Sequence, residues 1–340
     1  MAKVTVSDWA EQDLPGGKAG TVLDVTGKTA DDLTDELLSQ YCENYRLTVK
    51  GKFGNDSEPY NNEGILAFAK IAQFVRNTAN NVKYFDFSQT TGINSISDAV
   101  TYEDSDGKEQ KANLSFYACY LIEANLPSTV TNISKAFKYC SWLTKVTGVE
   151  HIEAGNNNEN IQGAFDYCSS LTDWPYMPKV QVIDGQFNGT KSNISTIEVD
   201  DYSEICNFGR IYATTVKLPK ATKLHLNSLG RFNKLTDLYL TADVFDEVET
   251  KDYNLSPKLY HSPFKIHEKR TGLNSDQTEC FDPTNVTLHL SATQKDKVTV
   301  TTDTEGTTCA WKPIDSMECP VYLTDFKQVI CGDEIVYTRE

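Results

Sequence analysis

Long apolar runs are missing from this sequence. No stretch approaches the roughly 18 consecutive apolar residues that a membrane-spanning helix needs. The amino terminus, MAKVTVSDWAEQDLPGG, also lacks the apolar core of a secretory signal. We therefore expect neither a transmembrane segment nor a signal peptide in the chain as given. Two locations remain open: a cell surface, if the chain is an ectodomain cut from its signal, or a virion, reached by assembly or lysis.

Basic residues are also scarce, with 32 Lys and Arg against 48 Asp and Glu, for a formal net charge of -16. The electrostatic field of a negatively charged protein repels polyphosphates and anionic lipid headgroups. We therefore expect neither a nucleic-acid partner nor direct membrane insertion. Hydrophobic residues make up 39% and aromatic residues 11% of the chain. This composition is typical of a soluble globular protein, and we expect folded structure almost throughout.

Catalytic and metal-binding motifs are absent. The nine cysteines form no CxxC pair and have no histidine nearby at zinc-ligand spacing, and the five histidines are scattered. Neither a nucleophile elbow, nor a HExxH helix, nor a phosphate-binding or dinucleotide loop is present. His261 and His267 are near each other, and YEDSDGKE (102–109) and VDDYSE (199–204) are acidic, but none has the spacing of a recognised site. We predict no catalytic residue, metal site or cofactor, although an unmarked active site in 246–280 remains a minor alternative.

An aromatic and cysteine motif recurs along the middle of the chain. Its copies are FYAC (116–119), AFKYCSWL (136–143), AFDYCSSL (164–171) and IDGQFNGT (183–190), with phenylalanines at 116, 137, 165 and 187. Apolar residues at strand spacing follow each copy and continue to Leu240. A unit of about 22 residues cannot close a core alone, so we expect the copies to stack and bury one another's apolar sides.

The cysteines divide into two groups. Cys119, Cys140 and Cys168 repeat one position of the motif, and we predict that they are buried thiols acting as small apolar residues. Cys309, Cys319 and Cys331 are the better disulfide candidates if the chain is extracellular, although their pairing stays open.

Residues 126–143, LPSTVTNISKAFKYCSWL, and 161–171, IQGAFDYCSSL, resemble the leucine-rich repeats of the BspA type. The resemblance covers 114–190 and fades toward 245; a weaker one covers the segments around YRLTVKGKFGND and VKYFDFSQTTGINSI. It implies a surface-exposed binding or adhesion protein of the kind found in Bacteroides-type bacteria. Similar repeats also occur in proteins carried by phages.

The expected fold is an α/β leucine-rich-repeat solenoid with one short parallel strand per repeat. Helical spacing in 29–45 and 62–79, and strand patterns in 46–53 and 82–88, predict an α/β cap at the amino-terminal end. The expected segments are the amino-terminal segment and cap (1–100), the repeats (101–245), an irregular connector (246–279) and a small mostly-β unit (280–340).

The expected binding surface is a stripe of residues on the solvent side of successive strands, because side chains alternate between the faces of a strand. Its residues are Asn125, Thr147, Pro175, Glu198, Lys217 and Tyr239. Trp174 flanks this stripe and is expected in the core. We hypothesise a non-enzymatic recognition or adhesion protein that binds a protein or glycan at a cell surface. The alternative is a structural component of a phage virion, such as a decoration, fibre or tail-associated protein that contacts neighbouring virion proteins.

Overall fold

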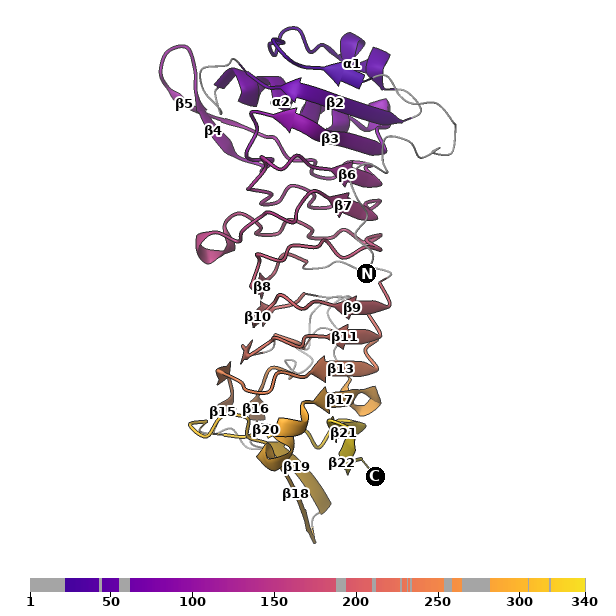
Figure 1. Cartoon of the computed structure of the whole chain (residues 1–340), viewed down its shortest axis with the longest axis vertical. Coiled ribbons are helices and arrows are strands. Elements are labelled where there is room, and N and C mark those ends of the chain that lie inside the picture. The colour runs from indigo at the N-terminus through magenta and orange to yellow at the C-terminus, as the bar shows by residue number, and fades with distance from the viewer. Residues whose placement is uncertain are drawn as a thin grey trace. The chain divides into compact units, whose positions relative to one another are not determined.

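The structure is a computed structural model. It describes residues 22–42, 45–54, 62–187, 194–209, 212–226, 228–230, 232, 234–253, 259–264, 282–304, 306–317 and 319–339. The chain divides into two compact units, Met1–Val149 and Glu150–Glu340. Figure 1 labels their helices and strands. This division differs from the four segments expected from the sequence. The sequence pattern of KVTV (3–6) also predicts a strand; this segment, His267 and Cys280 lie outside the described residues.

The first unit is built on a five-stranded sheet in the order β1-β2-β3-β6-β7, and every pair in it is parallel. Its strands are β1 (Val22–Asp24), β2 (Arg46–Lys52), β3 (Tyr84–Thr91), β6 (Glu123–Asn125) and β7 (Lys145–Thr147). A hairpin of β4 (Val100–Glu103) and β5 (Glu109–Ala112) stands apart as a second sheet. The predicted order of strand, helix and parallel strand over residues 46–88 is confirmed.

The described part of this unit contains two α-helices. In α2 (Asn62–Arg76) apolar residues recur at helical spacing and are buried, and the ring of Phe68 meets that of Phe53 edge to face at 5.5 Å. Helix α1 (Asp35–Tyr41) begins after Thr34, whose hydroxyl accepts a hydrogen bond from the Leu37 amide. The predicted helix over 29–45 was therefore too long at both ends.

The second unit contains two larger sheets. One has the order β14-β12-β10-β8 and is wholly parallel, and the other has the order β22-β21-β17-β13-β11-β9 and is parallel except for its last pair, β21 and β22. From β8 to β14, successive strands alternate between the two sheets (Figure 1). The strands are β8 (Val182–Asp184), β9 (Thr196–Glu198), β10 (Glu204–Asn207), β11 (Thr215–Lys217), β12 (Lys223–Leu224), β13 (Asp237–Leu240), β14 (Glu247–Val248), β17 (Thr287–Leu290), β21 (Gln328–Cys331) and β22 (Glu334–Thr338).

Smaller elements complete the second unit. β15 (Lys251–Tyr253) and β16 (Leu259–His261) form an antiparallel hairpin within the predicted connector. β18 (Val298–Asp303), β19 (Gly306–Trp311) and β20 (Val321–Tyr322) form an antiparallel sheet. The strands predicted after residue 280 are present, but β17 pairs in register with β13 and so continues the preceding parallel sheet. Short 3-10 helices occur in this unit at Asn156–Asn158, Pro283–Asn285 and Ala292–Lys297, and in the first unit at Thr78–Asn80.

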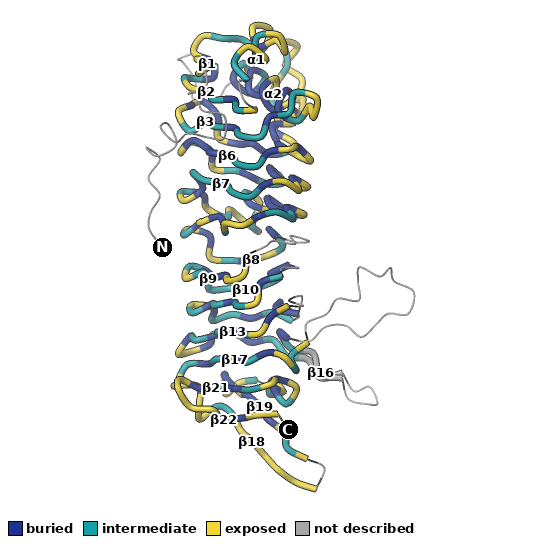
Figure 2. Tube along the Cα trace, turned by 90° about the vertical axis from the view of Figure 1, so that its right-hand side faces the viewer, coloured by how far each residue is buried: buried dark blue, intermediate teal, exposed yellow. Residues whose placement is uncertain are grey.

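The repeated phenylalanines form the core of each unit. Phe116 and Phe137 stack with ring centroids 5.7 Å apart in the first unit, and Phe165 and Phe187 stack at 5.3 Å in the second. All four are fully buried. Trp174 is half-buried and stacks on Phe187 with ring centroids 3.9 Å apart, as expected of a residue that packs against the core. Figure 2 shows that buried stretches recur along both units, with exposed turns between them.

The motif cysteines are buried thiols that form no disulfide bond, which confirms their predicted role as small apolar residues. The thiols of Cys119 and Cys140 lie 3.5 Å apart, and Cys140 donates a hydrogen bond to the Phe116 carbonyl at 2.9 Å. The later disulfide candidates are free in this structure as well: Cys309, Cys319 and Cys331.

The expected fold class, an α/β leucine-rich-repeat solenoid, is wrong. The described chain is rich in β-structure that falls into six sheets, and three of these contain only antiparallel pairs. Among the described residues, α1 and α2 are the only α-helices, and both precede residue 77. The segments that return from one strand to the next carry turn residues and lack an apolar period of 3.6, so they form bends and turns where helices were implied.

Candidate functional site

Three residues of the predicted stripe lie side by side in the second unit. Glu198 on β9, Lys217 on β11 and Tyr239 on β13 occupy equivalent positions in the registers of these strands. The Lys217 ammonium nitrogen lies 3.1 Å from Glu198 Oε2 and 5.8 Å from the centroid of the Tyr239 ring. The row is thus one ion pair beside one cation–π contact, and its polar groups largely interact with each other.

His289, on β17, extends this row by one strand. Its imidazole stacks on the Tyr239 ring with centroids 3.9 Å apart and planes 7° from parallel. Its Nε2 lies 3.2 Å from Asp237 Oδ1. Sequence reasoning missed His289 because it lies far from Tyr239 along the chain. The strand itself was predicted, but nothing in its pattern identifies β13 as its partner.

The other three predicted stripe residues are placed differently. Asn125 on β6 is 2% exposed; it donates to Asp86 Oδ1 at 3.2 Å and accepts from the Thr147 hydroxyl at 2.9 Å. Thr147 on β7 is half-buried, whereas Pro175 is buried and belongs to no strand. The expected exposure of Asn125 and Pro175 was therefore wrong. Asn125 is buried because hydrogen bonds to polar residues of the neighbouring strands draw its amide inward. Pro175 is buried because the third motif copy is not followed by the expected strand.

A cluster of exposed aromatic side chains lies in the first unit, on the two turns 116–120 and 137–142. We call it the aromatic cluster: Tyr117, Tyr120, Tyr139 and Trp142, which are 45%, 39%, 42% and 51% exposed. Tyr117 meets Tyr139 edge to face at 5.4 Å, and Tyr120 meets Trp142 at 5.8 Å. The turns stack above the rings of Phe116 and Phe137, which brings outward side chains from the two turns together, although neither aromatic pair occupies equivalent positions of the motif.

Lys83, which directly precedes β3, joins the aromatic cluster. Its ammonium nitrogen lies 4.5 Å from the Tyr120 ring centroid and 4.4 Å from that of Trp142. Burial lowers the pKa of Lys83. The cluster therefore combines apolar ring faces with a cation that they partly surround. The sequence contains a signal for it, since Tyr120 and Trp142 follow the first two Phe-x-x-Cys elements, whereas serines follow the third. These aromatic residues lie on turns, whereas the predicted stripe lies on strands.

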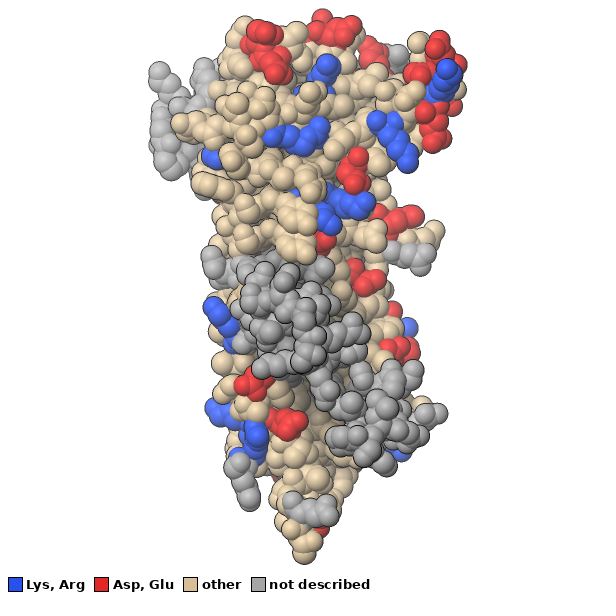
Figure 3. Space-filling model, turned by 180° about the vertical axis from the view of Figure 1, so that it is seen from behind, with Lys and Arg blue, Asp and Glu red and all other residues tan. Residues whose placement is uncertain are grey.

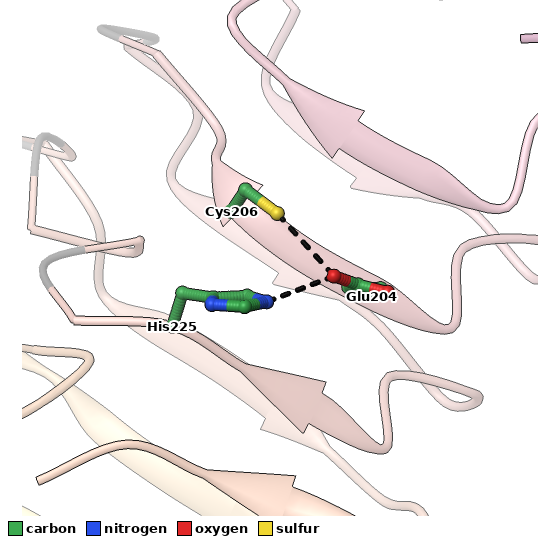
Figure 4. A group of neighbouring side chains, drawn as sticks. All are labelled: Glu204, Cys206 and His225. Atoms are coloured by element: carbon green, nitrogen blue, oxygen red, sulfur yellow. Dashed lines mark hydrogen bonds and ion pairs between the residues drawn. The ribbon is translucent and has the colours of Figure 1, made fainter. Parts of the chain in front are cut away.

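A second polar group lies on the other sheet of the second unit. Glu204 and Cys206 on β10 and His225, just after β12, converge from neighbouring strands (Figure 4). His225 Nε2 lies 2.9 Å from Glu204 Oε1, and its Nδ1 lies 3.1 Å from Glu249 Oε1. Glu204 ends the acidic run VDDYSE, which no sequence pattern connects with a cysteine or a histidine.

The charges of this group are mutually dependent. Burial alone would lower the pKa of His225, but hydrogen bonds and ion pairs with Glu204 and Glu249 raise it above its usual value. The hydrogen bond from His225 lowers the pKa of Glu204. Burial, together with the nearby charge of Glu204, raises the pKa of the Cys206 thiol to about 12. Both ring nitrogens of His225 thus face carboxylate oxygens, which favours the protonated imidazole, and the Cys206 thiol beside them is favoured in its neutral form.

On the face shown in Figure 3, acidic and basic side chains are interspersed among uncharged ones.

Within the part of the chain that the structure describes, no helix has the length and apolar character needed to cross a membrane. No family model matches the chain, and the searches of curated proteins and of solved structures returned no match either.

Proposed function

We propose that this chain is a non-enzymatic recognition protein that binds a protein or glycan at a cell surface, and that the aromatic cluster is its contact surface. The exposed packing of Tyr117, Tyr120, Tyr139 and Trp142 is the observation that carries the proposal. The resemblance of residues 114–190 to BspA-type repeats implies the same class of function.

Neighbouring exposed aromatic residues are a feature of binding surfaces. Scattered single apolar residues are normal on a protein surface, whereas a group of them needs an explanation. Tyrosine and tryptophan are enriched at the centres of interfaces because each offers a large rigid face and one polar group at a small entropic cost. Lys83 adds a positive charge between two rings, which supplies a hydrogen-bond donor for a carboxylate or hydroxyl group of a ligand.

The support beneath the aromatic cluster is rigid. The two turns are joined by backbone hydrogen bonds from Phe116 N to Ala136 O at 2.7 Å and from Ala118 N to Lys138 O at 2.9 Å. Tyr139 has a positive φ of 64°, a conformation that is uncommon for a bulky residue and persists only where its surroundings determine it. The rings are consequently held in place before any ligand arrives, which lowers the entropic cost of binding.

The test is binding of the fluorescently labelled full chain to a panel of bacterial and animal cells, measured by flow cytometry. The double variant Tyr120→Ala, Trp142→Ala is compared with wild type, and Tyr176→Ala is the control, because Tyr176 is 58% exposed and lies outside the cluster. We expect the double variant to lose at least about 10-fold in apparent affinity with its melting temperature nearly unchanged. Periodate treatment of the cells abolishes binding if the ligand is a glycan, and protease treatment abolishes it if the ligand is a protein. Equal binding by wild type and the double variant contradicts the proposal.

A further inference from the structure

The polar group around His225 is built from equivalent positions on three neighbouring parallel strands. Ile205 pairs with Leu224, and Leu224 pairs with Val248, so the next residue on each strand brings Cys206, His225 and Glu249 into one row. Glu204 stands two residues before Cys206 and therefore projects from the same face of β10. Backbone hydrogen bonds from His225 N to Ile205 O at 3.1 Å and from Glu249 N to Leu224 O at 2.9 Å fix this register.

Three of these side chains converge on one point. A carboxylate oxygen of Glu204, the sulfur of Cys206 and a ring nitrogen of His225 all lie within 4.8 Å of one another. Glu204 Oε1 is 2.9 Å from His225 Nε2 and 3.6 Å from Cys206 Sγ. Bonds of about 2.0–2.3 Å from a tetrahedral zinc ion to such atoms place neighbouring ligands roughly 3.3–3.6 Å apart. The Glu204–Cys206 distance matches this spacing, the Glu204–His225 distance must lengthen by a few tenths of an ångström, and Cys206 Sγ and the His225 nitrogen, which lie within 4.8 Å, must close to about 3.5 Å.

An independent feature, the contact of Glu249, indicates which imidazole nitrogen faces the ligands. Glu249 Oε1 lies 3.1 Å from His225 Nδ1, and its Oε2 accepts a hydrogen bond from the Leu226 amide at 3.0 Å. A carboxylate that is anchored in this way and accepts from one imidazole N–H is the usual outer partner of a metal-bound histidine. It keeps the proton on Nδ1 and directs Nε2 toward Glu204 and Cys206.

We propose that Glu204, Cys206 and His225 bind a divalent transition-metal ion, with Glu249 as the residue that orients His225. The donor set of one thiolate, one imidazole and one carboxylate selects Zn²⁺ over the oxygen-seeking ions Ca²⁺ and Mg²⁺. Binding of the ion releases two protons to solvent, the one between His225 Nε2 and Glu204 and the one on the Cys206 thiol. The side chains of Glu204 and His225 are each 27% exposed, so the ion has a route from solvent and keeps one position for water.

The bound ion links β10 to β12, the two inner strands of a four-stranded sheet. An ion that binds only the folded chain stabilises it in proportion to the logarithm of its concentration above Kd. This inference is independent of the proposed recognition function, because the aromatic cluster belongs to the other unit.

The test uses the untagged full chain, stripped with a chelator and titrated with Zn²⁺, with bound metal counted by equilibrium dialysis and elemental analysis. We expect wild type to bind one equivalent and to melt at a higher temperature with it. Cys206→Ser and Glu204→Gln should each weaken binding by at least about 100-fold, and Glu249→Gln by about 10- to 100-fold. The control Cys319→Ser removes another half-exposed thiol and should leave binding unchanged.

A second measurement covers the case in which a variant fails to fold. Co²⁺ replaces Zn²⁺ in wild type, and a thiolate-to-cobalt charge-transfer band in the near ultraviolet reports a Cys ligand. The proposal is overturned if wild type binds no Zn²⁺, if it shows no such band, or if Cys206→Ser and Glu204→Gln bind Zn²⁺ as tightly as wild type.

Discussion

The rings of Phe165 and Phe187 lie parallel within 10°, with their centroids 5.3 Å apart, although they belong to different copies of the motif. Both side chains are fully buried. Phe165→Ala removes a stacked ring and leaves a cavity, so we expect it to lower the free energy of unfolding by about 3–5 kcal/mol. Phe165→Leu keeps most of the volume and should cost less than about 1.5 kcal/mol. Urea denaturation distinguishes the two, and an alanine variant within about 0.5 kcal/mol of wild type, the effect of a surface substitution, would show that the stacked rings do not carry the core.

The same backbone geometry precedes each of the last three motif phenylalanines. Lys135, Gly163 and Gly185 stand two residues before them and have φ values of 56°, 59° and 75°. Glycine adopts this conformation freely and lysine does not, so Lys135→Gly should raise the free energy of unfolding by roughly 0.5–1 kcal/mol.

The control for this prediction accounts for the contact of Lys135 with Asp98 at 3.3 Å, a partly exposed pair worth between about 0 and 1 kcal/mol. The substitution is therefore also made in an Asp98→Ala background, where the gain should be at its largest. Lys138→Gly, at a position without positive φ, should destabilise the chain. A loss of stability for Lys135→Gly in both backgrounds would refute the predicted strain.

The close approach of neighbouring strands is most evident at Gly148, just after β7. A Cβ built on this residue would lie 2.1 Å from the Leu126 carbonyl oxygen, and its φ is 78°. Because the obstacle is backbone, Gly148→Ala should cost several kcal/mol, on the order of 3 or more, or prevent folding. Gly107→Ala is the matched control, since φ is 73° there but nothing lies within 4 Å of the added Cβ. Its cost should be about 1 kcal/mol; equal melting temperatures for the two variants would contradict the predicted contact.

Features set by residues that are close in the sequence could be predicted, whereas features set by contacts between distant segments could not. The phenylalanines and cysteines were predicted correctly because they recur at fixed offsets, and α2 because its apolar residues follow one helical face. The fold class was wrong because the family pattern implied more helix than the turn-rich return segments can form. Asn125 was expected to be exposed because the alternation of side chains along a strand assigns it to the solvent face. That alternation does not reveal the Asp86 carboxylate, which draws the Asn125 amide inward.

The side-chain groups of the site were harder to predict for the same reason. Cys206 and His225 are distant in the sequence, at no recognised ligand spacing, and only the pairing of β10 with β12 brings them together. His289 reaches Tyr239 only because β17 pairs with β13 across the long segment that separates these strands in the chain. The aromatic residues of the cluster stand within or beside the motif copies in the sequence, but only the stacking of the turns places Tyr120 against Trp142.

The row on the β9–β11–β13 sheet gives a further prediction about charge. Lys217 and Glu198 form a pair whose side chains are 37% and 45% exposed. Solvent screens such a pair, so a double-mutant cycle with Glu198→Gln and Lys217→Met should give a coupling energy of about 0.2–1 kcal/mol that falls as salt is added. A coupling above roughly 2 kcal/mol, or one unaffected by salt, would show that the pair is more deeply buried than the structure has it.

The most direct test of the central claim observes the aromatic cluster during binding. The chain is labelled with fluorotryptophan, and the ¹⁹F resonance of Trp142 is assigned by its loss in Trp142→Phe. The titrant is the glycan or protein fraction released from cells that bind the chain. Our account predicts that the Trp142 resonance shifts on binding while that of Trp311, which is fully buried in the other unit, stays unchanged. A bound state in which the Trp142 resonance does not move would contradict it.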